Sequence, residues 1–355
     1  MSEDLAHALT PQGDFYTDPF RLARERTHIF FDTWQWAGRL ADLAKPGDYF
    51  TTTVTGEPLL VLRDTAGGVR AFHNVCAHRA GPVAEGAGCR AVLQCGYHGW
   101  TYALEGQLLG APEMEGVVDF DRAAFGLRPV RVSTWGPFVF VNVDGRAPPL
   151  LDWLEGIPAR LERFPLEGMT LVERRSYEVR CNWKVYVDNY VEGYHIPIVH
   201  PALMREVDYA RYRVLTFGSY SEAVAPLRRG SESGGPRSYP PDAEASDVAY
   251  LWLFPNLMLN VYPGNLQLNL VEPDGPERTL VHFEWYAMEA GTDAARERIR
   301  KAVDLAEVVQ REDTAVCEAV QRGLQSIGYT RGRYSVKREN GVFHFHRLVE
   351  RFLAR

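Results

Sequence analysis

The hydrophobic pattern divides the chain into a helical start, a β-rich stretch and a longer mixed remainder. Residues 15–44 carry aromatic and aliphatic side chains at helix-like spacing, which predicts one or two helices. From about Gly47 the period changes to short β-rich runs separated by glycine turns, which predicts antiparallel hairpins. These runs cover residues 49–54, 58–62, 69–72, 100–103, 108–109 and 137–143. The pattern therefore predicts a small all-β domain at about 45–147.

Beyond Pro148 and Pro149 the pattern mixes helices with strands. It predicts an amphipathic helix over 150–164, a strand over 170–179 and a long amphipathic helix over 293–323. Between them lie four strand-like runs with Pro-Gly and Pro-Asp-Gly turns, which predict an antiparallel sheet under a pocket. These runs cover residues 250–254, 257–262, 266–271 and 280–286. The second part is thus predicted to be an α+β domain at 148–355.

Two further segments have a less regular pattern. Residues 226–247 are rich in Gly, Ser, Pro and charge, which predicts a mobile surface loop over the pocket entrance. Residues 341–346 read as strand or helix, and we expect them to be structural. His344 and His346 in this segment are a candidate second metal pair.

Composition narrows the class of protein. The 355 residues are 46% hydrophobic and 24% charged, which is ordinary for a globular protein of two domains. A net charge of -7 without a Lys/Arg run argues against a nucleic-acid surface, and no apolar run is long enough to span a membrane. Five cysteines do not make a disulfide framework, and the polar N-terminus is unlike a secretory signal, so we expect a cytoplasmic protein. Three of them are expected to be buried small hydrophobes, namely Cys89, Cys181 and Cys317.

Two short loops each offer one thiol and one imidazole. The order is Cys76 and His78, then Cys95 and His98. A zinc finger would place two cysteines together and two histidines further on, although a structural zinc site stays an alternative. The interleaved order fits a [2Fe–2S] Rieske centre, in which two cysteines hold one iron and two histidines hold the other.

The residues around these ligands resemble a known family. Cys-Ala-His-Arg at 76–79 and Cys-Gly-Tyr-His-Gly-Trp at 95–100 are similar to the two halves of the Rieske motif of ring-hydroxylating oxygenase α subunits. Gly96 stands where many members have proline, which softens the turn without touching a ligand. The resemblance implies a Rieske domain at 45–147 and a helix-grip-like catalytic domain at 148–355 that includes N-terminal helices at 1–44.

A second motif carries His195 and His200. Five residues apart, they would lie about 140° apart on one helix, so Pro197 predicts a helix that ends near His195 and a loop that returns His200. Asp188 and Glu192 are four apart and are expected on one helical face. The segment, including Asn-Trp-Lys at 182–184 and Asp-Asn-Tyr at 188–190, resembles the mononuclear iron motif of the same family.

The third ligand of a 2-His-1-carboxylate site cannot be chosen by periodicity. The resemblance of the segment from Glu312 onward implies Asp313 as that ligand. Glu312 and Glu318 are the alternatives, and Asp304 is a weaker one.

The resemblance also implies partners. No phosphate-binding glycine loop follows a strand, so electrons from NAD(P)H must arrive through a separate reductase, directly or through a ferredoxin. Family members are head-to-tail trimers, in which a carboxylate links the cluster of one subunit to the iron of the next. Glu192 is the candidate for this conduit, bonded to His195 and, across the interface, to His98. Asp188 is the second candidate.

The chemistry expected is oxygenation with O2 of a small substrate. The segments 188–200 and 312–328 are more similar to members that act on choline, betaines and carnitine than to naphthalene-type dioxygenases, which favours hydroxylation or oxidative N-demethylation. Aromatic-ring hydroxylation is the alternative, and a Rieske electron carrier without a second metal is the alternative from another class. Five aromatic residues are candidates for holding a cationic ammonium, namely Tyr190, Tyr194, Trp252, Phe254 and Tyr262.

Overall fold

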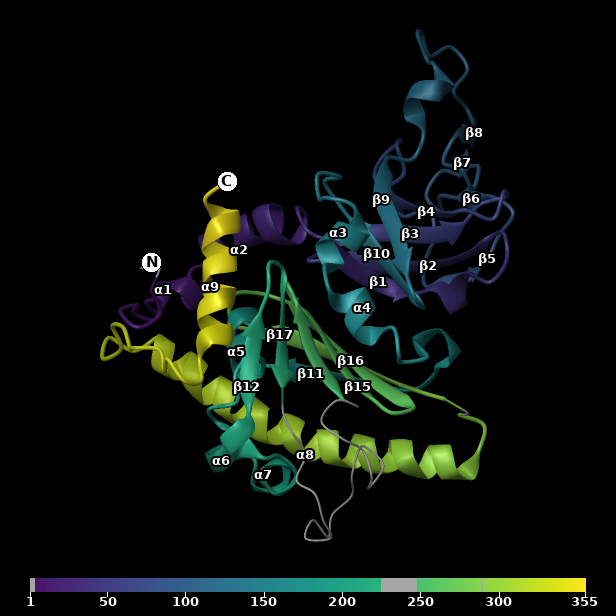
Figure 1. Ribbon diagram of the computed structural model, residues 1–355. Helices are drawn as coiled ribbons and strands as arrows, with labels where there is room; N and C mark the ends of the chain where they lie inside the picture. The colour runs from purple at the N-terminus through teal and green to yellow at the C-terminus, as the bar shows by residue number, and fades with distance from the viewer. Residues whose placement is uncertain (1–3, 225–247, 289) are drawn as a thin grey trace. The chain divides into compact units, whose positions relative to one another are not determined.

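The computed structural model describes residues 4–224, 248–288 and 290–355, in two compact units (Figure 1). One unit is Phe30–Trp153, and the other joins the N-terminal segment up to Ile29 with Leu154–Arg355. The sequence predicted these divisions at about 44/45 and 147/148. The whole of the predicted loop at 226–247 lies outside the described residues.

The first division differs because part of the predicted N-terminal helix is a strand. Helices α1 (Asp14–Thr17) and α2 (Pro19–Glu25) and a π-helical turn, Arg26–Phe30, are followed by β1 (Gln35–Arg39). This strand pairs antiparallel with β10 (Phe138–Asn142), and its register shifts between Trp36 and Gly38. The irregularity breaks the two-residue period that reveals a strand in a sequence.

The Phe30–Trp153 unit is built on antiparallel strands. A seven-stranded sheet has the order β1-β10-β9-β4-β3-β2-β5, and β6, β7 and β8 form a second sheet. The bounds are β2 Asp48–Val54, β3 Glu57–Arg63, β4 Val69–His73, β5 Ala87–Cys89, β6 Leu93–Gln94, β7 Thr101–Tyr102, β8 Leu108–Gly110 and β9 Pro129–Trp135. The predicted all-β domain is therefore present, and each Cys-His loop leaves one of its strands, β4 or β6.

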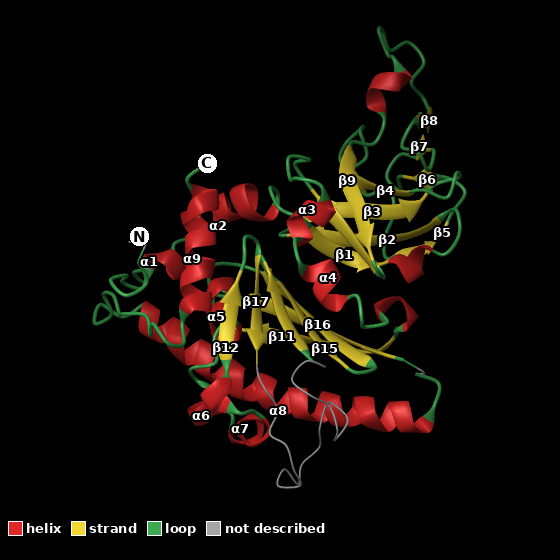
Figure 2. Cartoon of the chain, viewed as in Figure 1, coloured by secondary structure: helices red, strands yellow, loops and turns green. Residues whose placement is uncertain are grey.

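The other unit carries a second seven-stranded antiparallel sheet (Figure 2). Its order is β11-β17-β16-β15-β14-β13-β12. The bounds are β11 Thr170–Val179, β12 Arg213–Thr216, β13 Tyr220–Val224, β14 Ala249–Leu253, β15 Leu257–Tyr262, β16 Asn265–Pro273 and β17 Thr279–Ala287. The five runs predicted at 170–286 are all strands, whereas β12 and β13 were not predicted.

Helices pack against this sheet, and the longest, α8 (Asp293–Leu324), contacts β11 and β17. The predicted helix at 150–164 is two short ones, because Glu155 adopts a left-handed backbone with φ of 49°. The C-terminal pattern is helical. The remaining bounds are α3 Leu150–Leu154, α4 Ile157–Leu161, α5 Trp183–Tyr190, α6 Ile196–Val199, α7 Pro201–Glu206 and α9 Asn340–Leu353. None of the helices in the described ranges is long and apolar enough to cross a membrane.

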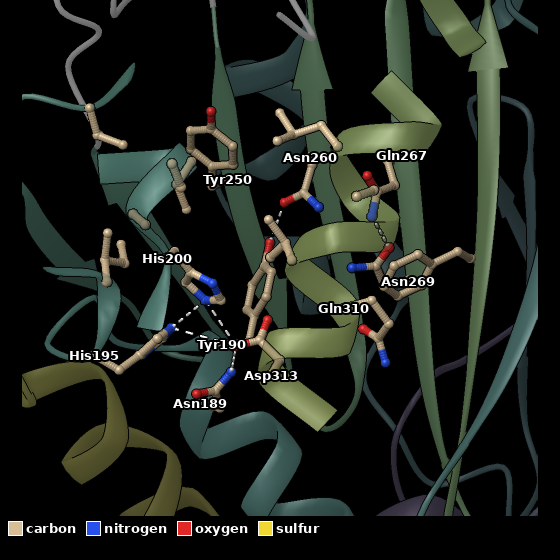
Figure 3. Close-up of a pocket in the computed structure, with 18 of the residues that line it drawn as sticks. Asn189, Tyr190, His195, His200, Tyr250, Asn260, Gln267, Asn269, Gln310 and Asp313 are labelled. Atoms are coloured by element: carbon tan, nitrogen blue, oxygen red, sulfur yellow. Dashed lines mark hydrogen bonds and ion pairs between the residues drawn. The ribbon is translucent and has the colours of Figure 1, made fainter. Parts of the chain in front are cut away.

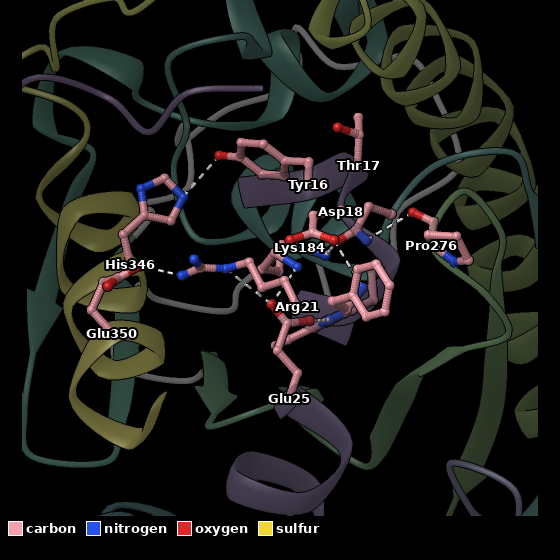
Figure 4. A network of polar contacts seen from close by, with 12 residues as sticks. Tyr16, Thr17, Asp18, Arg21, Glu25, Lys184, Pro276, His346 and Glu350 are labelled. Atoms are coloured by element: carbon pink, nitrogen blue, oxygen red, sulfur yellow. Dashed lines mark hydrogen bonds and ion pairs between the residues drawn. The ribbon is translucent and has the colours of Figure 1, made fainter. Parts of the chain in front are cut away.

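A buried ion pair joins α2 to α5 (Figure 4). The Lys184 ammonium donates to Glu25 at 2.6 Å, and the Trp183 indole donates to the second Glu25 oxygen at 2.8 Å. Both Lys184 and Glu25 are at most 1% exposed. Burial lowers the pKa of Lys184, and the Glu25 charge opposes that shift. The pair therefore keeps two charges out of water only while both partners are present.

A second buried cluster ties both ends of the chain to α5. Asp188 accepts a hydrogen bond from the Tyr16 hydroxyl at 2.7 Å and lies 2.8 Å from His346 Nε2. Tyr334 bonds the other nitrogen of His346 at 2.7 Å. His344 and His346 lie on α9 two residues apart and therefore point to different sides of the helix, so the predicted metal pair is wrong.

The three remaining cysteines differ in burial. Cys181 and Cys317 are buried, as predicted, whereas Cys89 is exposed on the edge strand β5. The exposure of Cys89 corrects the prediction, which took each of these residues for a small core side chain.

The Glu25–Lys184 pair yields a stability prediction. Glu25→Ala should lower the free energy of unfolding by about 3–5 kcal/mol, because the Lys184 ammonium is left buried without its partner. The double variant Glu25→Leu/Lys184→Met should lose less, because no ammonium is left buried without its partner and Arg21, 3.6 Å from Glu25, keeps its contact with Glu350. Urea titration followed by circular dichroism compares the two. Equal losses in the single and double variants would contradict this view of the pair.

Candidate functional site

The two Cys-His loops bury their thiols and expose their imidazoles. Cys76 and Cys95 are 3% and 2% exposed, whereas His78 and His98 are exposed. Each cysteine opens a tight turn, with Ala80 N–H donating to Cys76 O and Gly99 N–H donating to Cys95 O, both at 3.0 Å. The loops approach closely, since a Cβ on Gly81 would lie 3.0 Å from Cys95 Sγ.

This donor set fits a two-iron cluster better than a zinc ion. The His78 and His98 ring centroids are 4.6 Å apart. Among the described residues, the four donors provide no set of three within 4.8 Å of one another, as a single tetrahedral ion requires. The Tyr102 hydroxyl lies 3.1 Å from Cys76 Sγ, and Trp100 stacks on His78 at 4.9 Å. A donor to a ligand sulfur and an aromatic cover are features that tune such clusters.

The second group of donors converges in the other unit (Figure 3). The Nε2 atoms of His195 and His200 are 3.1 Å apart, and Asp313 Oδ1 lies 3.0 Å from His200 Nε2 and 3.7 Å from His195 Nε2. Two ligand atoms about 2.1 Å from one metal ion and at a right angle are about 3.0 Å apart. Two imidazoles and one carboxylate at this spacing form the facial ligand set of non-heme iron.

The local fold that brings the histidines together differs from the prediction. Helix α5 ends at Tyr190, well before His195, and the one-turn helix α6 lies between the two histidines. Pro197 therefore lies in the first turn of α6 instead of ending a longer helix. The intervening chain packs tightly, because a Cβ on Gly193 would lie 2.4 Å from the Tyr212 ring.

Two carboxylates orient the histidines by accepting hydrogen bonds from their Nδ1 atoms. His195 Nδ1 donates to Glu192 Oε1 at 2.5 Å, and His200 Nδ1 donates to Glu312 Oε2 at 2.7 Å. With the proton held on Nδ1, each Nε2 presents its lone pair to the same point. Burial opposes protonation of His200, but hydrogen bonds and attraction from Asp313 and Glu312 raise its pKa. The same negative charges would stabilise a cation at that point.

The alternative carboxylates point elsewhere. Glu318 pairs with Arg180 at 2.9 Å, and Asp304 lies 3.3 Å from Arg300 on the exposed side of α8. Asp188 and Glu192 do not share a helical face as predicted, because α5 ends between them. Asp188 bonds Tyr16 and His346 instead of either metal-facing histidine.

Sequence reasoning missed Asn189, which donates from Nδ2 to Asp313 Oδ1 at 2.7 Å. It also missed the amides that line the adjoining cavity. The cavity has a volume of about 200 Å³ and is lined by His195, His200, Asp313 and Glu192, and by tyrosines, neutral amides and apolar side chains. The amide residues are Asn189, Asn260, Gln267, Asn269 and Gln310. The sequence signal was present, since Gln267 and Asn269 alternate with leucines, but alternation also describes a solvent-facing strand.

The aromatic candidates divide into two groups. Tyr190 and Tyr262 line the cavity, together with Tyr186, Tyr212 and Tyr250. Trp252 and Phe254 are core residues at most 1% exposed, and Tyr194 is 55% exposed on the surface. None of these last three is brought to the cavity.

Comparison with known proteins also indicates a [2Fe–2S] domain and a non-heme iron domain. A family model described as the ring hydroxylating alpha subunit (catalytic domain) matches residues 166–355, and one described as the Rieske [2Fe-2S] domain matches residues 33–121. The match to the catalytic domain contradicts the alternative of an electron carrier with no second site. The two matches together identify an oxidoreductase with a [2Fe–2S] cluster and a mononuclear iron, supplied with electrons by a partner reductase.

Relatives cover nearly the whole chain. Choline monooxygenase from Arabidopsis thaliana is 34% identical, over 97% of this chain and 83% of its own. The carnitine monooxygenase oxygenase subunit of Escherichia coli K12 is 33% identical, over 96% and 93%. The structure of the quaternary ammonium Rieske monooxygenase CntA with L-carnitine is 30% identical with a TM-score of 0.85, over 98% and 97%. Naphthalene 1,2-dioxygenase from Rhodococcus, 19% identical with a TM-score of 0.81 over 98% and 95%, shares the fold. The chain belongs to the ring-hydroxylating oxygenase α subunits, the Rieske-type oxygenases.

Proposed function

We propose that this chain is the terminal oxygenase that hydroxylates or oxidatively N-demethylates a small quaternary ammonium substrate. The observation that carries the proposal is the convergence of His195, His200 and Asp313 on the wall of a tyrosine-lined cavity. In this proposal these three residues bind the ferrous ion. The cluster ligands are Cys76, His78, Cys95 and His98.

The cavity supports a small cationic substrate. Its volume of about 200 Å³, as bounded by the described residues, is below the roughly 300–1,000 Å³ of sites for drug-sized ligands. Burial raises the pKa of Tyr190 and of Tyr212, so their rings are neutral phenols whose faces attract a cation. The relatives named for choline and carnitine act on trimethylammonium compounds, which have this chemistry.

Each residue at the iron site has a distinct duty. When bound, the ferrous ion supplies open positions for O2, and the cluster supplies electrons. Glu192 and Glu312 keep the His195 and His200 protons on Nδ1, so both Nε2 atoms stay available as ligands. The Tyr194 N–H donates to Glu192 and fixes its rotamer. Asn189 holds the Asp313 carboxylate, and the tyrosine rings exclude water around the substrate.

Electron delivery in this proposal crosses a subunit interface of a head-to-tail homotrimer. Glu192 is bonded to His195, and its carboxylate reaches His98 of the neighbouring subunit. The proposal of an intersubunit contact is supported by exposed side chains beside both metal sites. His98 and Tyr97 are exposed beside the cluster, and Tyr194 and Ile198 are 55% and 85% exposed beside the iron site. A reductase, with or without a ferredoxin, provides the electrons from NAD(P)H.

Oxygen uptake tests the function. With a surrogate reductase, the chain should consume O2 and form product with at least one of choline, carnitine or glycine betaine, and should not oxidise NADH alone. Oxidation of aromatic acids with none of the ammonium compounds would replace the proposal with aromatic-ring hydroxylation.

Iron content tests the ligand assignment. The parent should hold about three iron atoms per chain, two in the cluster and one mononuclear. Asp313→Ala should hold about two with the cluster absorbance unchanged, because the facial set loses one ligand. Glu312→Gln, the matched control, should still bind about three, with mononuclear affinity weakened by about 10- to 100-fold. The reverse outcome for the two variants would assign the ligand to Glu312.

The coupling of O2 consumption to product formation tests whether Glu192 carries electrons to the iron site. Glu192→Ala should keep both metals yet lower coupled product formation by about 100-fold, the upper end of losses from outer carboxylates. The measurement is product formed per O2 consumed, with iron content checked in parallel. Asp188→Asn is the control, because Asp188 contacts Tyr16 and His346 and should leave coupling intact. Normal turnover in Glu192→Ala, or uncoupling in Asp188→Asn, would transfer the role away from Glu192.

A further inference from the structure

Three amides form one wall of the cavity, on two paired strands. Asn260 of β15 lies directly opposite Gln267 of β16, and Asn269 follows two residues later on the same face. Asn260 and Asn269 are 8% and 4% exposed. Figure 3 shows Gln267 and Asn269 across the cavity from His195 and His200, so the amide wall is remote from the metal-facing residues.

The hydrogen bonds among these amides determine which donors and acceptors the wall offers to a ligand. The Tyr190 hydroxyl donates to Asn260 Oδ1 at 2.6 Å, and Gln267 Nε2 donates to Asn269 Oδ1 at 2.9 Å. The oxygens of both asparagines are thus engaged. These two hydrogen bonds among the described residues use the Oδ1 atoms of Asn260 and Asn269 and not their Nδ2 groups, and both residues line the cavity. They offer N–H donors, and Gln267 Oε1 offers an acceptor.

The charge distribution separates the two ends of the cavity. The carboxylates of Asp313 and Glu192 lie at the metal-facing end. Among the described lining residues there is no Lys or Arg, so the amide wall presents only neutral groups. A hydroxyl, which both donates and accepts, can satisfy such a wall. Against the lining that the described residues provide, a carboxylate would be desolvated without a countercharge, which is unfavourable.

We infer that Asn260, Gln267 and Asn269 bind the hydroxyl group of an ammonium alcohol, so that its N-methyl groups face the metal site. This inference rests on the proposed function, and it adds the substrate class and the position of oxidation. With the hydroxyl held at the remote wall, the carbon nearest the metal is a methyl on nitrogen. The chain then acts as an N-demethylase of ammonium alcohols.

N-Demethylation needs only O2, two electrons from the reductase and two protons besides the substrate. A methyl C–H bond is replaced by C–OH with one oxygen atom of O2, and the other atom leaves as water after taking an electron pair from the reductase and two protons. The N–CH2OH intermediate then loses the hydroxyl proton and breaks its C–N bond. The electron pair of that bond stays on nitrogen, giving a tertiary amine and formaldehyde.

The affinity of the holoenzyme for ligands of matched shape tests whether the amide wall binds a hydroxyl group. Choline and n-propyltrimethylammonium have the same shape, but only choline carries a hydroxyl, and glycine betaine carries a carboxylate instead. Anaerobic calorimetry should show choline bound about five- to tenfold more tightly than either, the range of one or two neutral hydrogen bonds. Asn269→Leu should remove this preference while leaving n-propyltrimethylammonium binding unchanged. Gln325→Leu, an amide outside the cavity, is the control.

Product analysis completes the test. Turnover of choline with a reductase should release formaldehyde and dimethylaminoethanol. Equal binding of choline and its propyl analogue, tighter binding of glycine betaine, or oxidation at the alcohol carbon would overturn the inference while leaving a quaternary ammonium oxygenase. If neither these three compounds nor carnitine binds or turns over, the proposed function itself fails. Iron content and circular dichroism of Asn269→Leu establish that any lost preference is not lost folding.

Discussion

Two imidazole nitrogens held 3.1 Å apart are the constraint on which the catalytic unit depends. Lone pairs this close repel each other unless a cation lies between them, so the arrangement needs support from outside. Glu192 and Glu312 provide it through the opposite ring nitrogens. Since Glu312 and His200 are 112 residues apart, the site exists only when α8 lies in its place.

Helix α8 is kept in that place by ion pairs on either side of Asp313. Glu307 contacts Arg175 at 2.8 Å, and Glu318 contacts Arg180 at 2.9 Å. Both arginines belong to β11 or follow it directly, so the helix is fixed to the edge of the sheet at two points. The position of the metal-facing carboxylate is thus set by contacts that never touch the metal. Glu318, a candidate ligand from its sequence, is one of these attachments.

The sequence revealed the elements whose pattern is local and regular. The strands at 170–179 and 257–262 and the long helix followed from their period. The interleaved Cys-His order indicated the cluster loops, whereas His195 and His200 were identified with the help of the family resemblance. Strand β1 could not be predicted, because its register shift between Trp36 and Gly38 interrupts the period. Nor could periodicity choose Asp313 over Glu312, because neighbouring acids on one helix differ only in which partner the tertiary fold brings to them.

The polar side of β16 carries the cavity, whereas Leu266 and Leu268 between its amides are at most 1% exposed in the core. Because successive side chains of a strand point to opposite faces, these two sets of residues are free to vary independently. If Gln267 and Asn269 bind the substrate hydroxyl as inferred, an exchange at either alters what the cavity recognises without removing a methylene from the core. One strand therefore divides two duties between its faces, and a side chain on the cavity face can be replaced while the leucine packing on the other face stays intact.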